Sequence, residues 1–163
     1  DDAIKTFFVK DVKPSIELRR ANRGEDVISR LLDYGWSDKA ILTEVIAYSV
    51  AGMATTREFL AMTAWYLFER PDMLERFRTG TEDEQFAILE EVLRLEPIVG
   101  ALIRHAAHRC PGAQLSFHEA RIFFEKLFAV PGIRLAKVPS IHWYRPISGY
   151  ELHDALITCD KAA

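Results

Sequence analysis

The sequence predicts a mainly α-helical chain with a small β element at its C-terminal end. Three observations support this. Apolar residues recur at helical spacing through most of the chain, and capping residues, glycines and prolines divide that pattern into segments. Beyond Val130-Pro131-Gly132 the helical spacing gives way to short β-branched and aromatic runs. With 163 residues, 49% of them hydrophobic, the chain is long enough for one domain with a sizeable core.

The first part of the chain predicts two short helices. Helical spacing over residues 3–21 predicts the first, which Pro14 should start or kink because proline lacks the N–H that a helix interior uses. Residues 25–32 predict the second, which ends at Tyr34-Gly35. We interpret the basic cluster at residues 19–23 as a solvated helix end rather than a docking site.

The longest helix is expected from Ser37, a suitable N-cap, to about Glu69, where Arg70-Pro71 ends it. Its centre, residues 48–56, consists largely of small and β-branched residues that form helices poorly. Two interpretations are open. Close helix packing against small residues is favoured by the composition alone, whereas a widened groove would present a threonine hydroxyl and a loosened backbone to a ligand.

The next helix has the signature of a capping box at Thr81 and Glu84 and should stop before Pro97. Within it Glu91 and Arg94 lie three residues apart, and therefore on one helix face. Such a pair is most often an ordinary exposed salt bridge. Taken alone, it decides nothing about function.

The remaining segments are expected to be extended, apart from one helix after residue 112. Residues 97–105 are interpreted as an extended piece. After residue 130 we expect strands at 133–135, 141–144 and 155–158, with turns at 148–149 and 153–154.

A cysteine precedes the helix that starts near residue 113, in the stretch His108-Arg109-Cys110-Pro111-Gly112-Ala113-Gln114-Leu115. Pro111 suits the first helical turn, where no N–H is needed. The backbone N–H groups and the positive dipole end at a helix start lower a thiol pKa, so Cys110 is a candidate metal ligand or nucleophile. Gly112 leaves room for a flat group close to the backbone. The alternative is a buried cysteine that acts as a small hydrophobe.

Composition excludes several classes of partner. The net charge of −3, with both signs interspersed, argues against nucleic acid and against a membrane surface. No apolar run reaches the roughly eighteen residues of a membrane span, and no basic-then-apolar leader opens the chain. Two cysteines, Cys110 and Cys159, are typical of a reduced compartment. We therefore expect a cytoplasmic protein.

The stretch around Cys110 resembles the haem-binding loop of the cytochromes P450, whose cysteinate binds the haem iron. Two further P450-like motifs lie upstream in the family's order. They are Ala51-Gly52 with Thr55, which is similar to the distal-helix pattern, and Glu91 with Arg94, which is similar to the E-x-x-R helix. The C-terminal strands are again P450-like. The resemblance covers nearly the whole chain, but only the C-terminal half of a P450.

This resemblance implies a partial cytochrome P450 fold and a haem-thiolate monooxygenase. Such an enzyme inserts one oxygen atom of O₂ into a small or medium apolar organic substrate, with electrons from a ferredoxin-type or flavin redox partner. The implied cofactor is haem b. The implied site residues are Cys110 on the iron with Gly112 beside it, Arg104 and His108 on the haem propionates, Ala51, Gly52 and Thr55 at the oxygen-binding groove, and the structural ion pair of Glu91 with Arg94.

The sequence departs from the family in two places. Ala54 stands where the family usually has an acid, which implies a water-mediated proton relay, or a peroxide-dependent or non-oxygenating variant. Only fifteen residues separate Arg94 from Cys110, and the family's Phe-Gly-x-Gly turn is absent. We expect one incomplete domain over residues 1–163, either a natural or engineered remnant or, as we favour, pieces of a longer protein joined near Ala106-Ala107.

Three alternatives stay open beside this interpretation. A zinc site is one, because its ligands could be His105, His108, Cys110 and Cys159, although their spacing matches no closed structural pattern. The second is a non-catalytic helical scaffold for interactions that never holds haem. The third is a haem-binding module without oxygenase activity.

Overall fold

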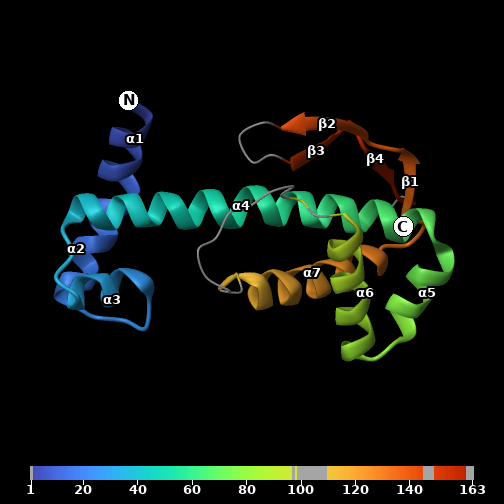
Figure 1. The fold of residues 1–163 in the computed structure, drawn as a ribbon, viewed down its shortest axis with the longest axis horizontal. Helices are drawn as coiled ribbons and strands as arrows, with labels where there is room; N and C mark the ends of the chain where they lie inside the picture. Colours follow the sequence, from blue (N-terminus) through green and yellow to red (C-terminus); the bar gives the residue numbers. More distant parts are fainter. Residues whose placement is uncertain (1, 97, 99–109, 145–148, 161–163) are drawn as a thin grey trace. The chain divides into compact units, whose positions relative to one another are not determined.

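The computed structural model describes residues 2–96, 98, 110–144 and 149–160, and it confirms a mainly helical chain with a small strand element (Figure 1). The helical elements are α1 (Asp2–Phe7), the π-helix η1 (Phe8–Val12), α2 (Lys13–Ala21), α3 (Val27–Asp33), α4 (Asp38–Glu69), α5 (Pro71–Thr79), α6 (Glu82–Leu95) and α7 (Ala113–Phe128). The strands are β1 (Arg134–Lys137), β2 (Ser140–Tyr144), β3 (Gly149–His153) and β4 (Leu156–Thr158). Two compact units, Asp1–Ala51 and Gly52–Ala163, divide within α4. The single incomplete domain stays a prediction, and the expected seam lies outside the described residues.

In the first unit the chain passes from α1 through a π-helical turn into α2. The N–H of Lys13 donates to the carbonyl of Phe8, five residues earlier. Pro14 then lies in the first turn of α2, where its missing N–H leaves no bond unmade. The proline thus starts a helix, as the sequence predicts, and the π-helical turn lets the chain reach it without a break.

The second helix of this unit starts at Val27, two residues later than the sequence pattern indicates. Asp26 is its N-cap and accepts from the N–H of Ser29 at 2.9 Å, and this hydrogen bond lowers the pKa of the Asp26 carboxyl. Gly35 has a φ of +74° after the helix, a conformation that glycine adopts without strain. The basic cluster is solvated as expected, and its three arginines pair with aspartates: Arg19 with Asp26, Arg20 with Asp38, and Arg23 with Asp33.

The second unit is built on an aromatic core between the C-terminal part of α4 and the helices α5, α6 and α7 (Figure 1). Phe124 of α7 is fully buried and contacts Phe77 of α5 and Phe128 of α7, with ring centroids 6.0 Å and 5.9 Å apart. The buried members of this core are Phe59, Leu67, Phe77, Ile88, Leu89, Ile98, Phe117, Ala120, Phe124 and Phe128.

Local signals fix the helix boundaries in this unit. The N–H of Ala40 donates to the Ser37 hydroxyl at the start of α4, and α4 ends at Glu69, as predicted. The capping box is also confirmed, since the Thr81 hydroxyl accepts from the N–H of Glu84 while the Glu84 carboxylate accepts from the N–H of Thr81. Helix α5 was not predicted from the sequence. Pro71 ends α4 and at the same time occupies the first turn of α5.

The strands form two antiparallel pairs, β1 with β4 and β2 with β3. The expected strands correspond to β1, β2 and β4, whereas β3 is not predicted. Gly149, which we expected in a turn, is instead the first residue of β3 and pairs with Tyr144. The expected turn at 153–154 is present, with Asp154 at a φ of +60° after β3. The extended piece expected at 97–105 lies almost wholly outside the described residues.

None of the helices in the described ranges has both the length and the apolar character needed to cross a membrane.

The core of the second unit makes a stability prediction. Phe124→Ala should lower the free energy of unfolding by about 3–5 kcal/mol, because it removes a fully buried ring and leaves a cavity. The neighbouring Phe123 is 42% exposed, so Phe123→Ala is the matched control and should lose clearly less. Urea unfolding followed by circular dichroism measures both, and equal losses would contradict this account of the core.

Candidate functional site

Cys110 lies in a tight turn that leads into α7. The N–H of Ala113 donates to the carbonyl of Cys110 at 3.2 Å, and α7 begins at Ala113 with Gly112 as its N-cap. The sequence predicts Pro111 in the first turn of the helix, and this prediction is wrong. Pro111 lies in the turn before the helix. Proline suits this second position of a turn because its ring fixes φ. The side chain of Cys110 is exposed, so the alternative of a buried small hydrophobe does not hold.

Gly112 leaves space beside this thiol. Its backbone has a φ of −85° and a ψ of −3°, which any residue can adopt. Among the described atoms outside its own chain neighbours, a Cβ at Gly112 would meet only the Cys110 sulfur, at 3.9 Å. The observation fits a role for Gly112 in keeping one side of the thiol open, and not in forming the turn.

The centre of α4 is open to solvent at Gly52. A Cβ built there has no neighbour within 4 Å among the described residues, and Met53 is 74% exposed. Close helix packing, the interpretation that composition favours, is therefore not found at Gly52. The helix is also α-helical throughout residues 48–56, so the loosened backbone of the other interpretation is not observed either. What the structure has is a regular helix with an open small-residue face.

Immediately after this face, α4 is attached to α7. Thr55 is half-buried, and the hydroxyl of the next residue, Thr56, lies 3.2 Å from the hydroxyl of Ser116 in α7. One turn further on, the rings of Phe59 and Phe117 pack edge to face with centroids 5.6 Å apart. The turn of α4 that carries Thr55 and the first turns after Cys110 thus belong to one packed region.

Glu91 and Arg94, the E-x-x-R pair, form a bidentate ion pair on α6. The Arg94 guanidinium donates to both carboxylate oxygens of Glu91, at 2.7 Å and 2.6 Å. These hydrogen bonds lower the pKa of the Glu91 carboxyl and raise the pKa of Arg94. Both side chains are largely exposed, so the pair itself stabilises the helix only slightly. Its family role as a structural ion-pair network stays a prediction.

Two of the predicted haem-binding residues, Arg104 and His108, lie outside the described residues, and so does His105. The zinc alternative needs His105 and His108, and it stays a hypothesis. Over the described ranges no three His, Cys, Asp or Glu side chains are grouped closely enough to hold a metal ion. Cys110 and Cys159 are both free and exposed.

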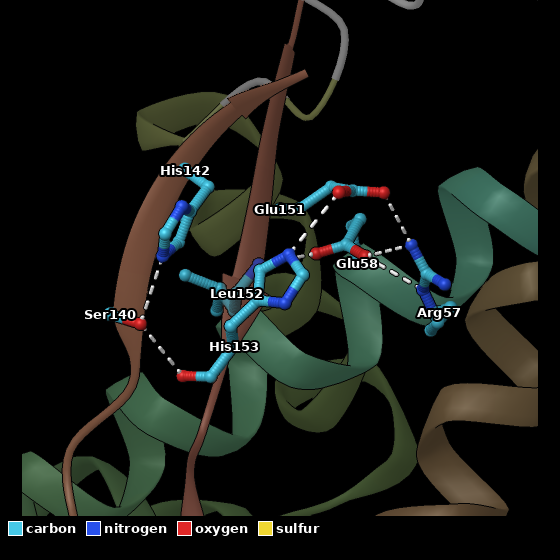
Figure 2. Close-up of polar contacts among 7 residues, drawn as sticks. All are labelled: Arg57, Glu58, Ser140, His142, Glu151, Leu152 and His153. Carbon is cyan, nitrogen blue, oxygen red and sulfur yellow. Dashed lines mark hydrogen bonds and ion pairs between the residues drawn. The ribbon is translucent and has the colours of Figure 1, made fainter.

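A polar cluster that was not predicted from the sequence lies on the opposite side of α4 from the aromatic core. Figure 2 shows Arg57 and Glu58 projecting from α4 towards Glu151 and Leu152 of β3. Glu58 is only 4% exposed, and the neighbouring carboxylates raise the pKa of Arg57, chiefly through its hydrogen bond to Glu58. A charged pair inside a long apolar helix is a sequence signal, but its partner strand was not predicted.

Comparison with known proteins finds cytochromes P450 both by sequence and by fold. No family model matches the chain. Two curated relatives are the self-sufficient cytochrome P450 monooxygenase CYP505E1 of Aspergillus niger, 28% identical over 104 residues, and CYP505E4 of Penicillium expansum, 29% identical over 109 residues. These alignments cover 58% and 60% of this chain, and the chain spans only 10% of each relative's length.

Two solved structures share the fold. P450BioI, crystallised with an acyl carrier protein ligated to hexadec-9Z-enoic acid, has a TM-score of 0.73 and 20% identity, over 91% of this chain and 52% of its own. CalO2 has a TM-score of 0.76 and 18% identity, over 98% of this chain and 54% of its own. The described fold is therefore about half of a P450 fold.

The ion pair on α6 makes a pH prediction. Arg94→Gln should return the pKa of Glu91 towards its ordinary value, because the hydrogen bonds from Arg94 are what lower it. The stabilisation from a lowered carboxyl pKa is present above the ordinary value and disappears as the pH falls through the lowered one. A carbon-13 NMR titration of the Glu91 carboxyl measures the shift. Arg121→Gln, which removes the ion pair with Glu125, is the control and should leave Glu91 unchanged.

Proposed function

We propose, from the premise that this is a partial chain of the cytochrome P450 family, that it belongs to a haem-thiolate monooxygenase. The reaction is the insertion of one oxygen atom from O₂ into a small or medium apolar organic substrate. The observation that carries the proposal is the exposed thiol of Cys110 in the turn before α7, within about half of a P450 fold. The chain spans a small part of its curated relatives, so the activity is proposed for the whole protein of which these residues form a part.

The residues at this turn fit haem b. A thiolate is a soft ligand suited to haem iron, and Cys110 is exposed to receive it. Gly112 leaves space beside the sulfur, and Leu115, in the first turn of α7, is an apolar side chain that is 63% accessible. Arg104 and His108 are proposed to bind the propionates, since a guanidinium forms paired hydrogen bonds to a carboxylate.

The chemistry that haem supplies when bound is oxygen activation, and a cysteinate ligand favours O–O bond cleavage over reversible oxygen storage. Thr55 is proposed to donate a hydrogen bond into the oxygen-binding groove, with Ala51 and Gly52 giving that groove its small-residue wall. Ala54 has no proton to offer. Protons therefore reach the groove through water held by the Thr55 hydroxyl, or the enzyme uses peroxide.

The proposed substrate and redox partner rest on the similarity to the family. The curated relatives are named self-sufficient, and P450BioI was crystallised with a fatty acid on a carrier protein. We propose an apolar organic substrate for this chain, and a ferredoxin-type or flavin protein as its source of electrons.

The ligand role of Cys110 is tested by spectroscopy. The dithionite-reduced protein with carbon monoxide should show the strongly red-shifted Soret band of thiolate ligation, and Cys110→Ser should lose this band. Cys159→Ser is the matched control, because that thiol is also exposed and free but lies after β4. It should retain the band.

The same sample also tests the alternatives. A haem-free protein would overturn the proposal and favour a helical scaffold. A protein with the band but without reductant consumption on any substrate would favour a haem-binding module.

Ala54 gives a second prediction. If protons arrive through water beside Thr55, then Ala54→Asp supplies an acid one residue away and should raise the product formed per reductant consumed. Ala54→Asn, of nearly the same size but unable to donate an acidic proton, is the control. No difference between the two variants would count against the water-mediated relay.

A further inference from the structure

Three consecutive residues after Thr55 attach α4 to two different elements. Thr56 bonds to Ser116 of α7, whereas Arg57 and Glu58 bond to β3. We refer to Thr56, Arg57 and Glu58 as the anchor. All of its contacts lie within the second unit.

Glu58 is the central residue of the anchor, because it is a carboxylate with only 4% exposure. Burying a carboxylate is costly unless it is paired and hydrogen-bonded. Here the N–H of Leu152 donates to one oxygen at 3.0 Å, and the Arg57 guanidinium donates to the other at 2.7 Å (Figure 2). Removal of Arg57 would leave the carboxylate without its counter-charge, and loss of the Leu152 N–H would leave one of its oxygens without a donor, so the three groups hold each other in place.

The bond to Leu152 attaches the edge of a strand to the helix. Within the described chain β3 pairs with β2 alone, which leaves its other edge with unpaired backbone groups. Glu58 accepts one of them. Arg57 reaches the neighbouring residue, donating to Glu151 at 2.9 Å, and Glu151 lies 3.2 Å from the ring nitrogen of His153. Since Arg57 is largely exposed, we assign this outer contact less weight than the buried one.

Two residues just before Thr55 are open among the described atoms. Gly52 has no described atom near its Cβ position, and Met53 points into solvent. Residues three apart are neighbours on a helix surface, so Glu58 lies next to Thr55 and one turn beyond it. The anchor therefore holds the helix directly beside Thr55, at Thr56 and at Glu58.

We propose that the anchor is a positioning device for Thr55, with Glu58 as its principal positioning residue. Thr56 fixes the helix on the α7 side and Glu58 fixes it on the β3 side, so the helix turn that carries Thr55 is held between two contacts. For catalysis this rests on the proposed function, because Thr55 is the residue through which the anchor would act. The positioning itself can be measured without haem.

The variant Glu58→Gln tests the proposal. It keeps the shape and an acceptor for Leu152, but it loses the charge that pairs with Arg57. We expect the exchange of the Leu152 amide hydrogen to accelerate, on the order of tenfold, because a hydrogen bond to a charged group is replaced by a weaker one. We also expect the methyl NMR resonance of Thr55 to move. In the haem-loaded protein, product per reductant should fall several-fold at unchanged haem content.

The control is Glu125→Gln, which removes an exposed carboxylate from an ion pair on α7 and should change none of these quantities. If Glu58→Gln does not fold, Thr56→Val and Thr56→Ser replace it. Thr56→Val should move the Thr55 resonance, whereas Thr56→Ser keeps the hydroxyl and should restore it.

The outcomes separate the two proposals. A Thr55 resonance that is unchanged in Glu58→Gln, or a lower yield per reductant that the control shares, overturns the anchor. An unmodified protein without haem or reductant consumption overturns the proposed function, and the NMR result then decides the positioning alone.

Discussion

The packing of α7 against α4 is the contact on which the second unit depends. It runs from the hydroxyl pair of Thr56 and Ser116 through two edge-to-face ring pairs, Phe59 with Phe117 and Phe68 with Phe128. Aromatic pairs of this kind bury large apolar areas and prefer a defined angle, so they fix both the distance and the register of the two helices. The rest of the aromatic core, from α5 and α6, packs on this pair.

The same constraint explains how α4 can carry a buried charge. Its core-facing side is occupied by α7, and its other side would expose apolar surface unless something covered it. The hairpin of β2 and β3 lies there, and its free edge needs hydrogen-bond acceptors. The Glu58 carboxylate accepts from the Leu152 N–H of this edge, and its charge is paired with Arg57. The strand edge thus gains an acceptor and the buried carboxylate gains a counter-charge.

Much of the helical fold could be predicted because its signals are local. Ser37 and the pair Thr81 and Glu84 mark helix starts through bonds that span three residues, and their geometry hardly depends on the rest of the chain. β3 was missed because Gly149 resembles a turn residue and because a strand is defined by its partner. Glu58 was missed for the same reason, since its bond to Leu152 spans 94 residues. Arg104 and His108 are predicted by resemblance alone, lie outside the described residues and stay predictions.

The two parts of the candidate site, the turn at Cys110 and the helix turn at Thr55, are connected through α7. Cys110 enters α7 through the turn at Ala113, and Ser116 follows in that helix and meets Thr56, the residue after Thr55. A displacement of α7 therefore moves the thiol and the Thr55 turn together, because a covalent helix and one hydrogen bond connect them. The β3 contact at Glu58 then opposes rotation of α4 from the other side. Catalytic groups must be held in a precise mutual geometry. In this chain the packing of α7 on α4 connects the turn of Cys110, the proposed iron ligand, to the helix turn of Thr55.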